Sequence, residues 1–180
     1  MHKPIKTYKA MKKYVIMLAK SFPRWHERKG QKTMFTKILS FGTSCNECST
    51  GGYAHCHLSC EHPALRKIHT IRENYELWAK RFEEIEAGNA CISIREWEGN
   101  PYRSSQKELI RLTKNDGIGL QRLTFAMNSL AHPFVDGISS TKADKIAHND
   151  GLTYHDWKKW FCKCDLSKYY AIIHFTKFRY

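Results

Sequence analysis

Four cysteines lie within sixteen residues of a segment, 42–64, that has almost no aliphatic side chains. The cysteines are Cys45, Cys48, Cys56 and Cys60, and the nearby histidines that can each replace one of them as a ligand are His55, His57 and His62. Thiolate and imidazole groups at such short spacing can close a tetrahedral site around zinc. So polar a segment buries too little apolar surface to offset the conformational entropy lost when it becomes ordered, and a bound metal would supply the free energy for this ordering. We expect structural zinc here, with an iron–sulfur cluster and plain reduced thiols as the alternatives.

A second group of reactive side chains occupies positions 67–72, where the sequence is KIHTIR. Ile68 and Ile71 would anchor this segment in the wall of a sheet, so that the polar side chains around them project into one mouth. Lysine and arginine neutralise phosphate charge, and a threonine hydroxyl can donate to a phosphate or base oxygen. We therefore assign to a nucleic-acid site the residues Lys67, His69, Thr70 and Arg72.

Aromatic and basic side chains also surround the turn at 99–101. Proteins commonly hold single-stranded RNA by stacking its unpaired bases on aromatic rings and arginine planes. The side chains in this second part of the predicted nucleic-acid site are Arg95, Trp97, Tyr102 and Arg103. Tyr102, beside Arg103, is the better stacking residue, because tryptophan is usually largely buried.

Both groups also have an ordinary structural interpretation. Arg72 would then pair with Glu73 or Glu76, and Lys67 would simply be exposed to solvent. Trp97 would be a core residue.

Hydrophobic periodicity predicts the elements that must position these residues. Alternating or β-rich runs predict strands at 14–18, 90–97, 108–112, 118–125 and 169–178. Helical spacing predicts a helix from Phe35 to Gly42 and another at 74–87 ended by Gly88, and Thr153 and Asp156 predict the start of a third. The fold class is therefore α+β, with several strands that suggest antiparallel pairing and about three helices.

The KIHTIR segment resembles the signature of the ASCH domain, a branch of the PUA-like barrels in which a Gly-x-Lys-x-x-Thr-x-Arg motif follows the first helix. Residues 92–106 (ISIREWEGNPYRSSQ) resemble the second and third barrel strands, and 150–161 with 170–180 resemble the late helix and closing strand. Leu65 and Arg66 stand where the family has its glycine. The resemblance implies a mixed β-barrel with peripheral helices, formed by a single domain at 14–180. A basic tail at 1–13 precedes it, and the Cys/His-rich loop at 42–64 is an insertion.

The same resemblance implies two functions. ASCH domains are similar to RNA-binding modules, which favours RNA or another nucleic acid as the partner. Some small members are amidohydrolases that remove an acyl group from N4-acetylcytidine, and their catalytic lysine, threonine and glutamate would correspond to Lys67, Thr70 and, less directly, Glu108. The best alignment puts Arg111 at the glutamate position, three residues from Glu108, so we favour the binding module over the enzyme. A regulatory domain whose insertion docks a protein is a further alternative.

The charge balance supports a polyanionic partner. Thirty lysines and arginines against seventeen aspartates and glutamates give the 180-residue chain a net charge of +13, and residues 1–37 hold eleven of these cations with a single glutamate. Such a surplus favours nucleic acid first and an anionic membrane surface second.

Hydropathy and cysteine content address the compartment. The longest apolar run, Tyr14–Ala19, has six residues, whereas a membrane-spanning helix needs about twenty and a signal peptide a core of about 7–15. The seven cysteines, an odd number, fit reduced thiols or metal ligands better than a disulfide framework. We expect a cytoplasmic protein without a membrane partner.

Overall fold

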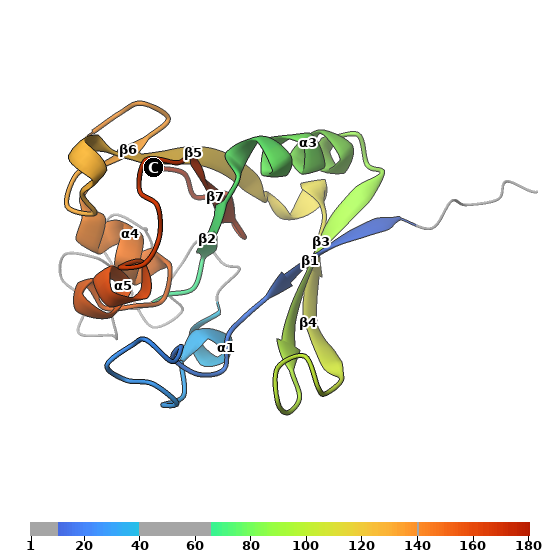
Figure 1. Cartoon of the computed structure of the whole chain (residues 1–180). Helices are drawn as coiled ribbons and strands as arrows, with labels where there is room; N and C mark the ends of the chain where they lie inside the picture. The colour runs from blue at the N-terminus through green and yellow to red at the C-terminus, as the bar shows by residue number, and fades with distance from the viewer. Residues whose placement is uncertain (1–10, 40–65, 140) are drawn as a thin grey trace, which may run out of the picture.

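The structure is a computed structural model, and it describes residues 11–39, 66–139 and 141–180 of the chain (Figure 1). The segment 42–64, with all the predicted zinc ligands, lies outside these residues, as does most of the predicted tail. Lys12 and Lys13, the last two residues of the predicted tail, begin strand β1 (Lys12–Met17) and pair with Ala90 and Cys91.

The described strands form two hydrogen-bonded sheets. In the first, β3 (Ala90–Trp97) lies between β1, which runs parallel to it, and β4 (Gln106–Leu112), which runs antiparallel. The second sheet is wholly antiparallel, in the order β2 (His69–Glu73), β7 (Tyr170–His174), β5 (Gly119–Phe125), β6 (Pro133–Val135). The predicted α+β class is confirmed. Within the described ranges no strand ladder joins the two sheets, so these strands do not form one closed barrel.

Helix α3 (Tyr75–Glu86) connects the two sheets along one side of the molecule (Figure 1). Its first turn is capped by Asn74, whose side chain accepts from the Leu77 N–H at 3.0 Å. Its spacing predicts that Tyr75, Trp78, Phe82 and Ile85 face inward; the last three are buried, and Tyr75 is partly buried. The predicted helix is confirmed, because both its apolar stripe and its cap are encoded locally.

The other helices are short. They are α1 (Phe35–Ile38), α4 (Ala143–Asn149) and α5 (Tyr154–Trp160), and the 3₁₀ turns are η1 (Lys114–Asp116) and η2 (Ala126–Asn128). Thr153 caps α5 as predicted, since its hydroxyl accepts from the Asp156 N–H at 3.1 Å. Helix α1 is a single turn and ends before the predicted stop. Helix α4 is absent from the predictions because alanines form much of its buried face, and alanine gives a weak periodic signal.

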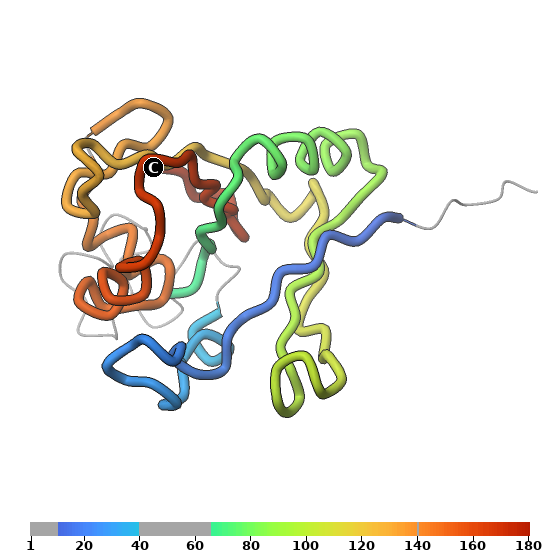
Figure 2. The backbone as a smooth tube through the Cα atoms, in the orientation of Figure 1, coloured from blue at the N-terminus to red at the C-terminus, as the bar shows by residue number. Residues whose placement is uncertain are grey.

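Helix α5 packs on the second sheet through aromatic rings. The fully buried Trp157 lies 6.1 Å, between ring centroids, from Phe125 of β5 and 5.1 Å from Phe161. The chain between α4 and α5 lies beside the start of β2, because Lys67 forms an isolated β-bridge with Asp150. At the same end of the molecule lie the loop of residues 18–34 and the tip of the β3–β4 hairpin (Figure 2).

Candidate functional site

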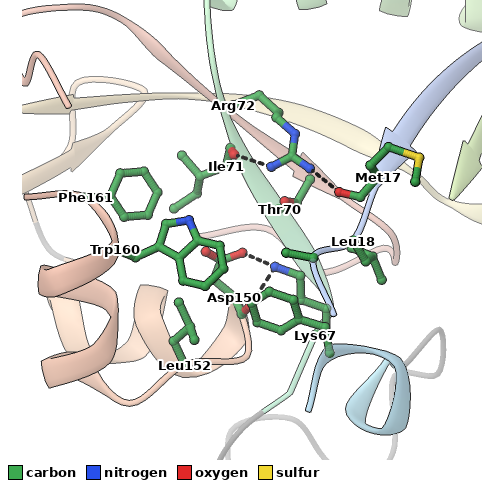
Figure 3. Close-up of a pocket in the computed structure, with 12 residues that line it drawn as sticks. Met17, Leu18, Lys67, Thr70, Ile71, Arg72, Asp150, Leu152, Trp160 and Phe161 are labelled. Carbon is green, nitrogen blue, oxygen red and sulfur yellow. Dashed lines mark hydrogen bonds and ion pairs between the residues drawn. The ribbon is translucent and has the colours of Figure 1, made fainter. Parts of the chain in front are cut away.

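Lys67 lies just before β2, and its ammonium group is buried in an ion pair (Figure 3). Its Nζ donates to a carboxylate oxygen of Asp150 and, at 2.7 Å, to the backbone carbonyl of the same residue. The ring of Phe35 lies 4.3 Å from Nζ. Only 3% of the lysine side chain and 7% of the aspartate side chain are exposed. The alternative of a solvated lysine is therefore wrong, because the fold supplies Lys67 with a buried carboxylate.

Three segments that are distant in the sequence bring this pair together. The backbone N–H of Lys67 donates to the Ile38 carbonyl at the end of α1, and Lys67 forms an isolated β-bridge with Asp150. Asp150 is the C-cap of α4, and Gly151 follows it with a φ of +87°. A Cβ at Gly151 would lie 3.0 Å from Ile38 Cδ1, a tight contact that the end of the Ile38 side chain would have to relieve, and the positive φ favours glycine.

Burial moves the pKa values of the two partners toward each other. It lowers the pKa of Lys67, against the opposing attraction of the Asp150 carboxylate. It raises the pKa of Asp150, against the opposing attraction of Lys67. Burial therefore opposes the charged form of each group, and each charge is compensated by its partner.

A cavity of about 60 Å³ opens beside the ion pair (Figure 3). Three further residues of the KIHTIR segment line it with Lys67, namely Thr70, Ile71 and Arg72. Its other walls come from the end of β1 and the chain after it, from α1, from the loop before α5 and from the end of α5: Met17, Leu18, Ala19, Phe35, Leu152, Trp160 and Phe161. The structure thus places three of the predicted site residues around one opening.

Arg72 holds the two sheets together. Its guanidinium donates to the backbone carbonyl of Met17 at 2.9 Å and to that of Ile71 at 3.0 Å. Both contacts are with backbone oxygens rather than with Glu73 or Glu76, so the predicted ion pair is not formed. The contact with Met17 fixes the end of β1 against β2 and closes one side of the cavity.

His69 points away from any surface. It is fully buried on β2, opposite His174 of β7, and its Nε2 lies 2.8 Å from the Tyr180 hydroxyl. Among the described residues neither ring nitrogen of His174 has a hydrogen-bond partner. Burial lowers the pKa of His69 well below its ordinary value and that of His174 to about 3, so both rings are neutral near pH 7. The prediction that His69 contacts nucleic acid is therefore wrong, since the ring belongs to the interior.

A larger groove, of about 910 Å³, lies between residues 17–25 and the tip of the β3–β4 hairpin. The hairpin contributes three of the predicted residues, Trp97, Tyr102 and Arg103. Trp97 is half-buried rather than a core residue, and its ring lies 5.4 Å from that of Tyr102. The opposite wall contributes three exposed residues that the predictions missed, Lys20, Arg24 and Trp25. An aromatic residue between cations, as in the sequence PRWHER, was the available signal.

Tyr102 has an unusual conformation at the hairpin tip. It has a φ of +63°, in the left-handed region, and its side chain and backbone together are 90% exposed. A bulky aromatic residue is uncommon in this region of backbone space. Neither packing nor backbone preference explains the position of this ring, which makes it a candidate ligand contact.

The cavity and the groove adjoin each other. Met17, Leu18 and Ala19 line both, so the chain leaving β1 forms the wall between them. The hydrogen bond from Arg72 to the Met17 carbonyl therefore positions a wall of the groove as well as a wall of the cavity.

Two predicted residues lie elsewhere on the hairpin. Arg95 donates to Ser93 Oγ at 2.8 Å and lies 3.6 Å from Glu108, whose carboxylate also accepts from Ser93 and, at 2.7 Å, from Arg111. Neither Arg95 nor Glu108 lines the cavity. These side chains bind one another across β3 and β4.

The predicted catalytic set is consequently brought together only in part. Lys67 and Thr70 share the cavity, but the carboxylate at Lys67 is that of Asp150, not Glu108. The sequence offered no signal for this partner, because 83 residues separate Asp150 from Lys67.

The predicted zinc ligands lie outside the described residues, so zinc binding stays a prediction. Within 11–39, 66–139 and 141–180 no cluster of three or more His, Cys, Asp or Glu side chains is arranged to hold a metal ion. Across the same ranges, no helix has the length and apolar character needed to cross a bilayer. Comparisons with protein-family models, with curated proteins and with solved structures gave no match.

Replacing His174 by Phe should flatten the dependence of stability on pH. Because the pKa of His174 is about 3 in the folded chain and near 6.5 when unfolded, the unfolded chain binds the extra proton below about pH 6.5. Between pH 7 and pH 5 the unfolding free energy of the wild type should therefore fall by about 2 kcal/mol more than that of His174→Phe. Urea titrations across this range measure it, and parallel curves for the two proteins would contradict it.

The ion pair can be tested by a double-mutant cycle. Lys67→Met leaves a buried carboxylate unpaired and should lower the unfolding free energy by about 3–5 kcal/mol at pH 7. Asp150→Asn should destabilise less, because the amide oxygen and the backbone carbonyl still accept from Lys67. The double variant should be more stable than the sum of the single losses predicts, by about 1–3 kcal/mol. Additive losses in urea unfolding would show that the two groups do not interact.

Proposed function

We propose that this protein binds single-stranded nucleic acid, RNA first, in the groove between residues 17–25 and the β3–β4 hairpin. The observation that carries the proposal is the ring of Tyr102, which is 90% exposed at the edge of a groove lined by tryptophans and cations. Unpaired bases stack on such rings, and phosphates bind the neighbouring cations.

The energetics of Tyr102 favour a bound partner. A non-glycine residue in the left-handed region is destabilised by about 1–2 kcal/mol. The exposed ring recovers little of this by packing, although it has one neighbour in Trp97. When a base stacks on the Tyr102 ring, the touching surfaces of base and ring are both buried, and this stacking contributes about 1–3 kcal/mol to binding.

The charges of the groove fit a polyanion. Arg24 and Arg103 lie on opposite walls, and Lys20 lies on the first wall with its Nζ 3.8 Å from the Glu96 carboxylate. The net charge of +13 would draw nucleic acid toward the protein from a distance, although it provides no sequence preference.

The proposal extends to the fold family. The two sheets, joined by α3 and by the Arg72–Met17 contact, are what an opened PUA-like barrel of the ASCH type would contain. The KIHTIR segment supports this assignment, since Lys67, Thr70 and Arg72 line a cavity that adjoins the groove. In this proposal Lys67 contributes to nucleic-acid binding from within the cavity, and the residues of the groove contact the rest of the strand.

Replacing Tyr102 by Gly should weaken RNA binding without weakening the fold. Loss of one stacked base predicts a fall in affinity for a uridine dodecamer of about 5- to 150-fold. Glycine removes the left-handed strain, so the unfolding free energy should stay equal or rise. Fluorescence anisotropy at 50 mM salt measures the first quantity, and urea unfolding the second.

Tyr169→Ala is the matched control for this experiment. Tyr169 is 50% exposed and lies 5.4 Å from the Arg122 guanidinium, but it does not line the groove. Its loss should leave RNA affinity unchanged. An equal loss in both variants, or no binding by the wild type, would refute the groove as a nucleic-acid site.

A second candidate function is an amidohydrolase acting on an N4-acylated cytidine. The observation that favours it is a buried lysine of lowered pKa in one cavity with a hydroxyl and a carboxylate. Lys67 would act as base or nucleophile, Thr70 would orient the acyl group, and Asp150 would supply the carboxylate predicted at Glu108.

Chromatography of N4-acetylcytidine incubated with the protein distinguishes the two functions. The binding proposal expects no appreciable release of cytidine by the wild type. Rapid release that falls about 10²–10⁴-fold in Thr70→Val and Asp150→Asn, but not in Glu108→Gln, would instead establish the enzyme. Circular dichroism of each variant checks that a loss of activity is not a loss of fold.

A further inference from the structure

The loop that carries Trp25 is fixed to helix α5 by a set of polar contacts. The buried ring of His26 places its Nε2 3.1 Å from the Asp156 carbonyl, and Arg28 donates to the Asp156 carboxylate at 2.8 Å. Glu27 binds Lys159 at 2.6 Å and His155 at 3.0 Å. The outer wall of the groove and the adjacent face of α5 are therefore one continuous surface.

This surface continues the positive charge beyond the groove. Lys163, exposed just after α5, has its Nζ 5.8 Å from the centre of the Trp25 ring. In the described part of the chain neither Lys163 nor the exposed Arg24 forms an ion pair with a carboxylate. Arg24, in the groove wall, and Lys163, beyond it, are thus two cations near Trp25 without a carboxylate partner in this part of the chain.

We propose that a polynucleotide leaves the groove over Arg24 and Trp25 and lays its next phosphates against Lys163 and Lys159. We call these two lysines the basic track. The inference rests on the proposed function, and it adds that the protein binds an extended strand rather than an isolated nucleotide. A base stacked on Trp25 would place its own phosphate within reach of Lys163, because the ring and the ammonium group are in contact distance.

Glu27 limits the charge of the basic track. Its hydrogen bonds from Lys159 and His155 lower its pKa to about 2, so it stays ionised and offsets the charge of Lys159. Removing this carboxylate should strengthen the binding of a strand that reaches the track. A role for Glu27 in anchoring the loop alone would give the opposite effect.

Binding of uridine oligomers of four and twelve nucleotides tests the inference. On this proposal the tetramer occupies the groove alone, whereas the dodecamer also reaches the basic track. Lys163→Gln should weaken dodecamer binding about 3- to 10-fold at 50 mM salt and reduce the salt slope by about 0.7, while tetramer binding stays within twofold. Glu27→Gln should tighten dodecamer binding alone, and the matched control Lys168→Gln, an exposed lysine paired with Glu73, should change neither.

The outcomes separate the two proposals. If the tetramer binds and depends on Tyr102, but Lys163→Gln leaves the dodecamer unaffected, the basic track is refuted and the groove stands. If neither oligomer binds, both proposals fail. If Lys163→Gln weakens binding of polyglutamate instead of the dodecamer, the surface serves an acidic protein and the inference is overturned.

Discussion

The buried ion pair between Lys67 and Asp150 is the contact on which the site depends. It lies where the end of α1, the start of β2 and the end of α4 meet, and backbone hydrogen bonds from Lys67 to Ile38 and from Ile68 to Asn149 join the same three segments. A charge taken out of water is tolerated only when a partner compensates it, so the three segments are held in one arrangement. Phe35 connects the ion pair to α5, because its ring packs against both the Lys67 ammonium and Trp160.

From Trp160 the packing reaches the groove. Its ring lies 5.8 Å from that of Phe22, which belongs to the loop that forms one groove wall. The other connection runs through Arg72, whose contact with the Met17 carbonyl fixes the wall that the cavity and the groove share. The interior charges thus determine the shape of an exterior surface, although none of them is exposed on it.

Two residues, one buried and one exposed, have arrangements that reduce the stability of the fold. His174 is buried with no partner for its ring nitrogens among the described residues, and Tyr102 is exposed in a left-handed conformation. Each feature reduces stability; His174 lies in the interior beside His69, and Tyr102 lies at the edge of the proposed site. Such exceptions to packing and conformational rules are expected where binding rather than folding selects the residue.

The sequence by itself determined what depends on neighbouring residues. The apolar stripe and cap of α3, the alternation of β3 and the Thr153 cap of α5 are local signals, and they predicted these elements because backbone preferences and periodicity act over a few residues. The same local chemistry selected Tyr102 and Arg103, since a turn must expose its side chains. Tertiary structure alone decided that Lys67 is buried, that Asp150 is its partner and that Trp25 faces the β3–β4 hairpin. Those outcomes arise from contacts between residues up to 83 positions apart, whose free energy comes from burial and charge pairing that no local pattern encodes.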